Sequence, residues 1–312
     1  KKKDLLAWIQ LPLFIFSFFI RALPHARKCD IIHAHWVLSA IPGLVLKWLY
    51  KKPLFLTVRE GDTNLISSNL IMRFIVRNSD YLIANTDEYF RHMRICGAPS
   101  TKFFKIRNGV DPIFRRIDKE VVREKFGLSS DNISIITAAY LIPRKNPELL
   151  LKAFIRIEKK YPALLLFFAG EGPLLEKLHD IVNSNNLSNK VKFIGNLNHR
   201  NLNMWFNASD IFCLPTNSDG IANSVVEAMQ CGLPVITTNV GGFPEIIGNG
   251  TSGFLMEPND LESLVSLLVK LIENPNLRLE MGISSQRQLI RKGINWKINA
   301  KLHLAAYQKV LN

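Results

Sequence analysis

Residues 214–238 read LPTNSDGIANSVVEAMQCGLPVITT, and this stretch decides the fold. The pattern predicts the end of a buried strand, a polar loop, a short helix and a second strand. We expect the helix to begin near Asn223 or Ser224, since both are good N-cap residues, and to end at Gly232, ahead of Pro234. A helix that begins beyond the carboxyl end of a strand leaves its first N–H groups free, so this helix start is a candidate anion site.

Two carboxylates, Asp219 and Glu227, stand eight positions apart in this stretch, one in the loop and one in the helix. For the pair alone, two interpretations stay open. Glu227 is either an early helical acid favoured by the helix dipole, or a carboxylate that faces the molecule carrying the anion. If that molecule is a phosphorylated sugar nucleotide, the carboxylate meets a ribose or sugar hydroxyl.

With its flanks, the stretch resembles the donor site of the retaining GT-B glycosyltransferases, specifically the GT4 family. That family has an acid, seven residues, then Glu, continuing as EAM-x-x-G-x-PV; here Glu227 opens EAMQCGLPV, and Asp219 stands where the family usually has Glu. The resemblance implies an α/β fold of two Rossmann-like parallel-sheet domains facing across a cleft. It implies that Glu227 holds the nucleotide ribose and that Asp219 orients the sugar. The donor would also meet the backbone of Gly220, Ile221, Ala222, Asn223 and Ser224.

A basic loop, YLIPRKNP at residues 140–147, follows a predicted strand. It resembles the family's G-R-L-x-x-x-K-G loop, whose Arg and Lys clamp the donor diphosphate. Lys145 takes the Lys position, Tyr140 takes the Arg position, and Arg144 is a candidate for the second positive charge. A diphosphate leaving group needs cations because negative charge builds on it as the glycosidic bond breaks. The alternative for Lys145 is a solvated loop lysine.

Two glycine-rich turns resemble the family's donor loops, AGEGP at residues 169–173 and GGFPEII at residues 241–247. We expect Gly170, Gly241 and Gly242 to let the backbone approach the donor closely, because glycine lacks a Cβ. For AGEGP alone, an ordinary strand-to-helix turn is the more probable interpretation.

The first domain carries candidate acceptor-side residues after two predicted strands, His33 and His35 after the first, Arg59 and Asp62 after the second. Residues 57–62, TVREGD, occupy the place of the family's T-x-H-G-x-D, so Arg59 replaces a histidine and Glu60 a glycine. An arginine there suits an anionic acceptor such as a phosphate. For both histidines, core packing or a structural hydrogen bond is an equally good interpretation.

Apolar runs bounded by turn residues alternate with helical stretches, which is typical of parallel α/β layers. We expect domains at residues 1–115 and 116–293, and a helix at residues 294–312 that returns to the first domain. That helix is predicted to be amphipathic through Trp296, Leu302, Leu304, Tyr307 and Leu311. The family's opening strand and Gly-rich loop have no counterpart before Asp30, so we expect a truncated first domain. The predicted strands are Ile31–His35, Leu54–Val58, Tyr81–Ala84 and Phe103–Ile106, then Ile133–Ala138, Leu164–Ala169, Val191–Ile194, Ile211–Leu214, Val235–Thr238 and Phe254–Met256.

The net charge of +14 over 312 residues calls for an anionic partner. Nucleic acid is disfavoured because no recognition motif is present and the basic residues are spread along the chain. The first residues, KKKD, precede a sixteen-residue apolar run that contains Pro12. This run is short for the ~20 residues that span a bilayer, and we expect a helix that is buried or lies at a membrane surface.

Four cysteines, at 29, 96, 213 and 231, lack metal-ligand spacing, so we expect no metal site and interpret Cys213 and Cys231 as buried free thiols. The predicted activity is a metal-independent, retaining glycosyltransferase of the hexosyltransferase type. It would move a sugar from a nucleotide sugar to a hydroxyl of a glycan or lipid-linked acceptor, in cell-surface polysaccharide biosynthesis. The nucleotide sugar is its donor substrate, and no cofactor is expected. We expect a cytoplasmic protein in peripheral contact with the anionic inner face of the plasma membrane.

Two other classes stay open. The chain could bind a donor without being active, which the missing opening, Tyr140 and Arg59 favour. It could instead be a nicotinamide oxidoreductase, since parallel α/β layers alone allow one. The second is disfavoured because no G-x-G-x-x-G follows an early strand.

Overall fold

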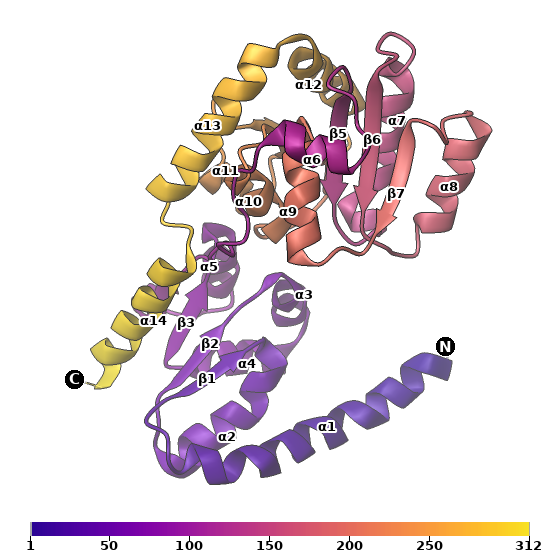
Figure 1. The fold of residues 1–312 in the computed structure, drawn as a ribbon. Coiled ribbons are helices and arrows are strands. Elements are labelled where there is room, and N and C mark those ends of the chain that lie inside the picture. Colours follow the sequence, from indigo (N-terminus) through magenta and orange to yellow (C-terminus); the bar gives the residue numbers. More distant parts are fainter. Residues whose placement is uncertain (1, 312) are drawn as a thin grey trace. The chain divides into compact units, whose positions relative to one another are not determined.

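The computed structural model describes residues 2–311, apart from the side chains of residues 2–9, 60 and 64. Lys1 of the basic start and Asn312 of the final segment lie outside the described residues, as does the side chain of Glu60. The chain forms two compact units, Lys1–Asn108 with Lys297–Asn312, and Gly109–Trp296 (Figure 1).

The first unit contains a parallel sheet of four strands in the order β1-β2-β3-β4. Each strand is joined to the next through helices, as parallel pairing requires. The strands are β1 (Ile32–His35), β2 (Leu54–Thr57), β3 (Tyr81–Ala84) and β4 (Phe103–Lys105), which confirms the four predicted runs to within one residue at each end. The connecting helices are α2 (Ala40–Tyr50), α3 (Glu60–Ser68), α4 (Leu70–Asn78) and α5 (Asp87–Ile95).

Side chains of these strands alternate between two cores, because successive strand residues point to opposite faces. Leu54 and Leu56 of β2 pack with buried residues of α2, α4 and α5. Phe55 lies between them and packs on the other face, against Ala306 and Tyr307 of α14 (Trp296–Leu311). The final helix therefore covers one face of the first sheet.

The predicted apolar face of α14 is wrong, although the helix lies within the predicted segment, residues 294–312. Trp296, Leu302, Leu304 and Leu311 are exposed, and of the predicted set Tyr307 is the one that packs on the sheet. The buried seam runs through Ala306, Tyr307 and Val310. These positions recur at the three- and four-residue spacing of a helix face, and the small Ala306 permits the close approach.

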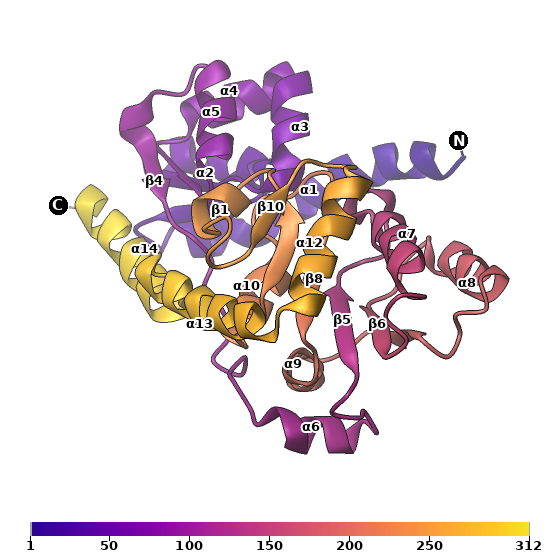
Figure 2. The ribbon, with the colours of Figure 1, turned by 90° about the horizontal axis from the view of Figure 1, so that it is seen from above.

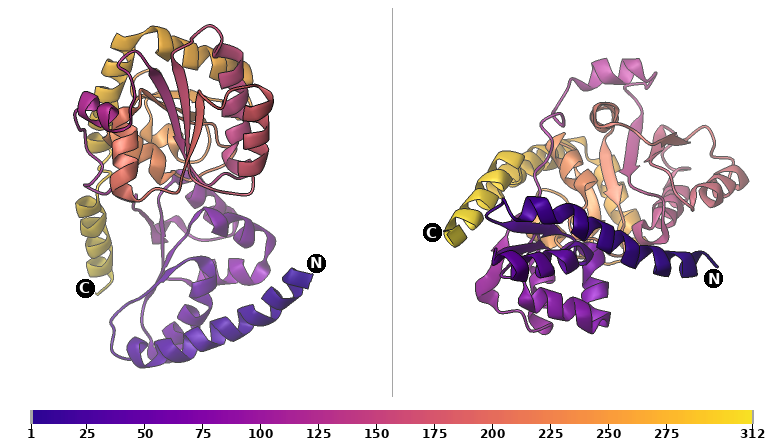
Figure 3. Two further views of the ribbon diagram at one scale, coloured as in Figure 1. Left: turned by 45° about the vertical axis from the view of Figure 1, so that its right-hand side comes forward. Right: turned by 90° about the horizontal axis from the view of Figure 1, so that it is seen from below.

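Helix α1 (Lys2–Ala26) continues through Pro12 and Pro24, so the proline in the apolar run does not end it. It lies along α2, and its amino-terminal half projects beyond that helix (Figure 1, Figure 3). Of the two predicted alternatives, burial is wrong for Leu13, Phe14 and Phe16, which are exposed. Within the described residues, no helix combines the length and the apolar character needed to cross a membrane.

The second unit contains a parallel sheet of six strands in the order β10-β9-β8-β5-β6-β7. Its strands confirm the predicted runs to within one residue: β5 (Ile133–Ala138), β6 (Leu164–Ala169), β7 (Val191–Gly195), β8 (Ile211–Leu214), β9 (Val235–Thr238) and β10 (Phe254–Met256). The helices are α6 (Lys119–Lys125), α7 (Pro147–Ile157), α8 (Leu175–Ser184), α9 (His199–Ala208), α10 (Asn223–Gln230), α11 (Phe243–Ile246), α12 (Leu261–Glu273) and α13 (Pro275–Arg291).

This sheet is buried on both faces, which explains why its strands read as nearly continuous apolar runs. Ile135 of β5 faces a core shared with α7, α8 and α12. The next residue, Ile136, faces a second core shared with α9 and α10. The two helix layers lie on opposite sides of the strands (Figure 2). Cys213 and Cys231 are buried free thiols in these cores, as predicted.

Candidate donor site

The strand order of the second sheet reverses between β5 and β8. From β5 the chain continues outward through β6 and β7, and then returns to place β8, β9 and β10 on the other side. In doubly wound sheets, ligands bind outside the carboxyl ends of the strands at such a reversal. The loops that leave β5 and β8, residues 139–146 and 215–222, meet at this point.

These two loops are fastened to each other through Arg144. Its backbone carbonyl accepts hydrogen bonds from the Asn217 N–H (2.8 Å) and the Thr216 hydroxyl (3.0 Å). Its guanidinium donates to the Ser218 carbonyl at 2.7 Å. The basic loop is therefore held in place by the loop that carries Asp219.

Three of the predicted site residues meet here. Asp219 is 8% exposed, and its Oδ2 accepts a hydrogen bond from the Lys145 ammonium in an ion pair. The Arg144 Nη1 lies 3.8 Å from Asp219 Oδ1. Two cations share one carboxylate, so the cluster keeps one positive charge. Tyr140, which replaces the family's arginine, points to solvent with 60% of its surface exposed.

The predicted glycines bring neighbouring backbones together at the same edge. A Cβ on Gly170 would lie 2.1 Å from the Ala139 carbonyl oxygen, in the loop after β5. A Cβ on Gly241, whose φ is +57°, would lie 1.7 Å from the Asp219 carbonyl oxygen. The Gly242 N–H donates to the Gly220 carbonyl at 2.6 Å. These glycines therefore set the positions of the loops that carry Lys145 and Asp219.

Helix α10 begins at Asn223, but its N-cap is Ala222, so the prediction of Asn223 or Ser224 as the cap is wrong. Alanine has no side-chain acceptor, and the first-turn N–H groups receive no side-chain cap. An uncapped helix start at a strand reversal is suited to bind an anion. The helix ends as predicted, with Gly232 in the left-handed region at φ +81°.

Glu227, on the second turn of α10, is half-buried, and burial raises the pKa of its carboxyl to about 7. The charge of His199 lowers this pKa, and the charge of Asp111 raises it. The His199 Nδ1 lies 3.4 Å from the Asp111 Oδ2. The described residues offer the Glu227 carboxylate no hydrogen bond. The sequence analysis did not place His199 or Asp111 at the site, although His199 begins the helix after β7 and Asp111 lies in the segment between β4 and α6.

The acceptor-side residues of the first unit fall into two groups. The His33 ring nitrogens form hydrogen bonds with Tyr307 Oη at 2.5 Å and with Thr57 Oγ1 at 2.8 Å. Burial lowers the pKa of His33 to about 3, and the charges of His35 and His303 contribute to this shift. Asp62 is fully buried and accepts hydrogen bonds from the Val37 and Arg59 N–H groups at 3.1 and 2.8 Å. Both side chains hold structure together.

His35, the last residue of β1, and Arg59, two residues after the end of β2, are by contrast exposed, and the two strands pair in parallel. Burial lowers the pKa of His35, and the positive charge of Arg59 is the next largest cause of that shift. These two side chains are therefore close enough to act together at the carboxyl edge of the first sheet.

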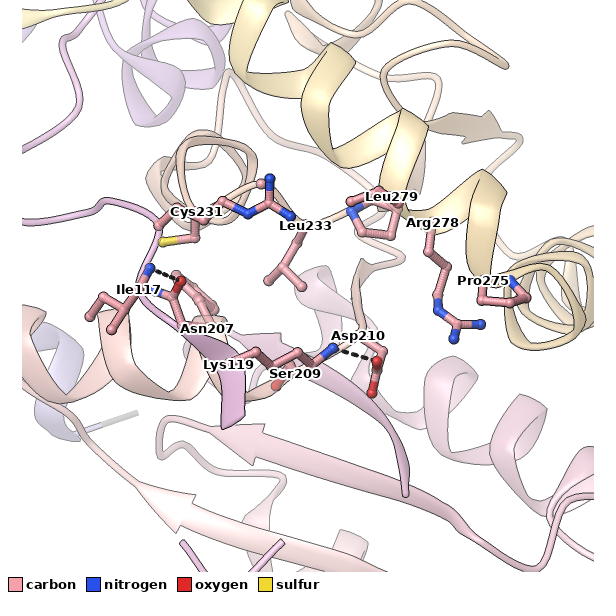
Figure 4. Close-up of a pocket in the computed structure, with 14 residues that line it drawn as sticks. Ile117, Lys119, Asn207, Ser209, Asp210, Cys231, Leu233, Pro275, Arg278 and Leu279 are labelled. Atoms are coloured by element: carbon pink, nitrogen blue, oxygen red, sulfur yellow. Dashed lines mark hydrogen bonds and ion pairs between the residues drawn. The ribbon is translucent and has the colours of Figure 1, made fainter. Parts of the chain in front are cut away.

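A separate hollow of about 240 Å³ lies at the opposite edge of the second sheet, beside the residues that precede β8 and β9 (Figure 4). Its Asp210 pairs with Lys119 at 2.5 Å and with Arg123 at 2.6 Å. The Arg278 guanidinium donates to the Leu271 carbonyl at 2.6 Å. These contacts fasten α6 to the residue before β8 and α13 to α12, so we interpret the hollow as structural.

Two family models match the chain. The model described as Glycosyl transferases group 1 matches residues 118–288. The chain belongs to this family. The model described as Glycosyltransferase Family 4 matches residues 3–114, so this group 1 protein carries a GT4-type first domain.

Curated relatives of this group 1 protein are glycosyltransferases. The D-inositol 3-phosphate glycosyltransferase of Kribbella flavida is 25% identical over 302 residues, covering 89% of this chain and 71% of that protein. The N-acetyl-alpha-D-glucosaminyl L-malate synthase of Bacillus anthracis is 24% identical over 292 residues, covering 90% and 75%. The predicted class, a glycosyltransferase, is confirmed.

Solved structures show the same fold. Anabaena Alr3699/HepE in complex with UDP and glucose superposes with a TM-score of 0.82 at 19% identity, covering 94% of this chain and 82% of that one. Sucrose-phosphate synthase from Thermosynechococcus elongatus gives 0.84 at 20% identity, covering 96% and 78%. The likeness confirms the GT-B fold for this group 1 glycosyltransferase.

Proposed function

We propose that this glycosyltransferase transfers a sugar, with retention of anomeric configuration, from a nucleoside diphosphate sugar to a hydroxyl group. The acceptor would be a glycan or a lipid-linked intermediate of cell-surface polysaccharide synthesis. The observation that carries the proposal is the cluster of Lys145, Arg144 and Asp219 at the strand reversal, on the loop that leads into the uncapped start of α10.

The donor diphosphate would bind to the net positive charge of this cluster. Lys145 and Arg144 carry two positive charges and Asp219 one negative charge, so the net charge of the cluster is +1. The amino terminus of α10 adds partial positive charge. Negative charge grows on the leaving diphosphate as the glycosidic bond breaks, so fixed donors there stabilise the transition state. The UDP complex of HepE, a protein of the same fold, supports a nucleoside diphosphate as the ligand.

Glu227 would accept hydrogen bonds from the ribose hydroxyls, and Asp219 would orient the transferred sugar. A carboxylate with a pKa near 7 gains from such donors, because hydrogen bonding to the charged form favours ionisation. The N–H groups of residues 220–224 would face the sugar and phosphates, with Gly170, Gly241 and Gly242 supporting the loops.

Retention would follow from attack on the face that the leaving group departs from. The bond between C1 and the diphosphate oxygen breaks, the acceptor oxygen bonds to C1 on the same face, and its proton passes to the departing phosphate oxygen. This route needs no protein nucleophile. We expect no metal requirement, because Lys145, Arg144 and the helix terminus can carry the charge.

On the first domain, Arg59 and His35 would meet the acceptor, with Asp62 and His33 as positioning residues. An exposed arginine suits a phosphorylated acceptor. The relative from Kribbella flavida is named for such an acceptor, which supports this assignment. The apolar and basic first domain supports a peripheral place at the inner face of the plasma membrane.

A second candidate is a protein that binds the donor but transfers poorly. The exposed Tyr140 in the place of the family's arginine favours it, since one diphosphate cation is then lost. The charge of Arg144 beside Asp219 argues that the loss is compensated.

Release of nucleotide from UDP-, GDP- and ADP-sugars, with the released sugar followed by proton NMR, tests the proposal. We expect one donor to be consumed and the first-formed product to keep the donor's anomeric configuration. Lys145→Gln should lower turnover about 100-fold or more, the loss typical of one removed transition-state donor. Lys152→Gln, an exposed lysine on α7, is the matched control and should leave turnover unchanged. First-formed product of inverted configuration would contradict retention, and no turnover with intact nucleotide binding would favour the second candidate.

A further inference from the structure

Helix α1 exposes large apolar side chains around most of its circumference. Leu13, Phe14, Phe16, Phe18 and Ile20 are 64, 63, 63, 46 and 48% exposed. At about 100° per residue these positions cover an arc of roughly 200°. A helix on the surface of a water-soluble domain normally shows an apolar stripe of about 100° that faces the core. Within the described residues, therefore, no other part of the chain covers this apolar arc of α1.

The remaining side of α1 borders an apolar groove against α2. Leu11, Ile15 and Phe19 of α1 and Ile41 and Val45 of α2 line a hollow of about 420 Å³. Its lining is apolar throughout, since Pro12, Phe16 and Pro42 complete it. The groove joins the exposed arc of α1 to the outer face of α2.

The apolar surface continues from α2 to α4. Trp48 follows Val45 by three positions and is exposed, and its ring lies 6.4 Å from that of Phe74 on α4. Leu70 and Ile71, one turn before Phe74, are 78 and 62% exposed. We call the exposed side chains of α1, α2 and α4 the apolar face. They are Leu13, Phe14, Phe16, Phe18, Ile20, Val45, Trp48, Leu49, Leu70, Ile71 and Phe74.

The segment that carries the apolar face is basic. Residues 10–80 contain nine arginines and lysines against four acids. Of the acids, Asp62 is fully buried and Asp80 pairs with Lys47 at 2.7 Å. Lys51 and Lys52 lie beside Trp48 in a shallow hollow at the end of α2. Lys51 and Lys52 therefore place positive charge at the rim of the apolar face, beside Trp48.

We propose that the apolar face docks on the surface of an anionic lipid bilayer, with α1 in the plane of the interface. Exposed Leu, Phe and Trp side chains would enter the boundary between headgroups and acyl chains, as in interfacial helices. The lysines at its rim would meet the anionic headgroups. A second copy of the chain is disfavoured as the occupant, because it would bring two basic rims together.

This inference rests on the proposed function, because membrane docking serves transfer to a lipid-linked acceptor. Docking would hold the enzyme where such an acceptor lies. The docking itself does not involve the donor site, so vesicle binding and nucleotide binding are separate measurements, and either can fail alone.

The test is flotation of the full chain with vesicles of phosphatidylcholine alone and of phosphatidylcholine with 30% phosphatidylglycerol. We expect binding to the anionic vesicles that weakens steeply as NaCl is raised, since salt screens the headgroup charge. Lys51→Gln with Lys52→Gln should weaken binding about 25-fold, from roughly fivefold for each basic residue near the surface. Leu13→Gln with Phe14→Gln should weaken it about 100-fold, from roughly tenfold for each apolar side chain removed from the interface.

Matched controls lie on the second unit. Lys152→Gln with Lys159→Gln changes two exposed lysines, and Ile290→Gln changes an apolar side chain that is 76% exposed on α13. These variants should bind vesicles like the unaltered protein. Absence of vesicle binding, or equal losses in the controls, would overturn the proposal. Self-association that the Leu13→Gln and Phe14→Gln changes abolish, without vesicle binding, would also overturn it and assign the face to a second copy.

Discussion

Replacing Glu227 by glutamine should stabilise the protein at alkaline pH while removing the ribose contact. Burial raises the pKa of this carboxyl from 4.5 to about 7, so the folded state disfavours the ionised form. Below pH 4.5 the carboxyl is protonated in both the folded and the unfolded chain, and the change to an amide alters little. As the pH rises toward 7, the unfolded chain ionises first and stability is lost; above 7 the loss is complete and constant.

The size of the effect follows from the pKa shift. At about 1.4 kcal/mol per pKa unit, the shift from 4.5 to about 7 sets a ceiling of about 3 kcal/mol. Part of the Glu227 side chain reaches solvent, so we expect Glu227→Gln to gain about 1–2 kcal/mol at pH 8 and close to nothing at pH 4.5. His199 and Asp111 are the ionisable groups that act on it, and both are unchanged in the variant.

The assay is urea unfolding followed by tryptophan fluorescence at pH 4.5, 6 and 8. Glu280→Gln, the same chemical change at an exposed position of α13, is the control, and its effect should not vary with pH. If Glu227→Gln were no more stabilising at pH 8 than at pH 4.5, the carboxyl would not be held in a disfavoured ionised state, and the reasoning would be refuted.

Three further predictions concern Gly241, Asp62 on α3 and Tyr307 on α14. Gly241→Ala should lower the free energy of unfolding by more than 2 kcal/mol, because the new Cβ would lie 1.7 Å from a backbone carbonyl oxygen. The control is Gly127→Ala, which is also at positive φ but has open space around it. This change should lower the free energy of unfolding by about 1 kcal/mol. Asp62→Ala should cost about 1–3 kcal/mol, because it removes the acceptor of two hydrogen bonds from backbone N–H groups, and an unchanged urea midpoint would contradict this. Tyr307→Phe removes the hydroxyl that bonds His33, so α14 should become more sensitive to limited proteolysis, and equal cleavage rates would refute that anchoring role.

The strands were predictable because their apolar runs are bounded by turn residues. Leu164–Ala169 and Val235–Thr238, for example, were located to the residue. Such strands are buried on both faces, and their composition alone marks them. The donor helix was located from its acids and its glycine stop, because Gly232 adopts the left-handed conformation that the stop requires.

Contacts between segments distant in the chain could not be predicted from local sequence patterns. The pairing of Lys145 with Asp219 depends on β5 and β8 being neighbours, which follows from strand order and not from any local pattern. The approach of Gly241 to the Asp219 carbonyl is likewise a tertiary contact. The buried seam of α14 was missed because its exposed leucines are more hydrophobic than Ala306, the residue that fits against the sheet.

The most direct test of the donor site is isothermal calorimetry of the protein with UDP, GDP and ADP, repeated with Glu227→Ala. The account predicts saturable binding of one nucleotide, lost in the variant and kept in Glu280→Ala. Absence of binding by a folded protein, or equal binding by Glu227→Ala, would contradict the assignment of the donor site to the strand reversal at β5 and β8.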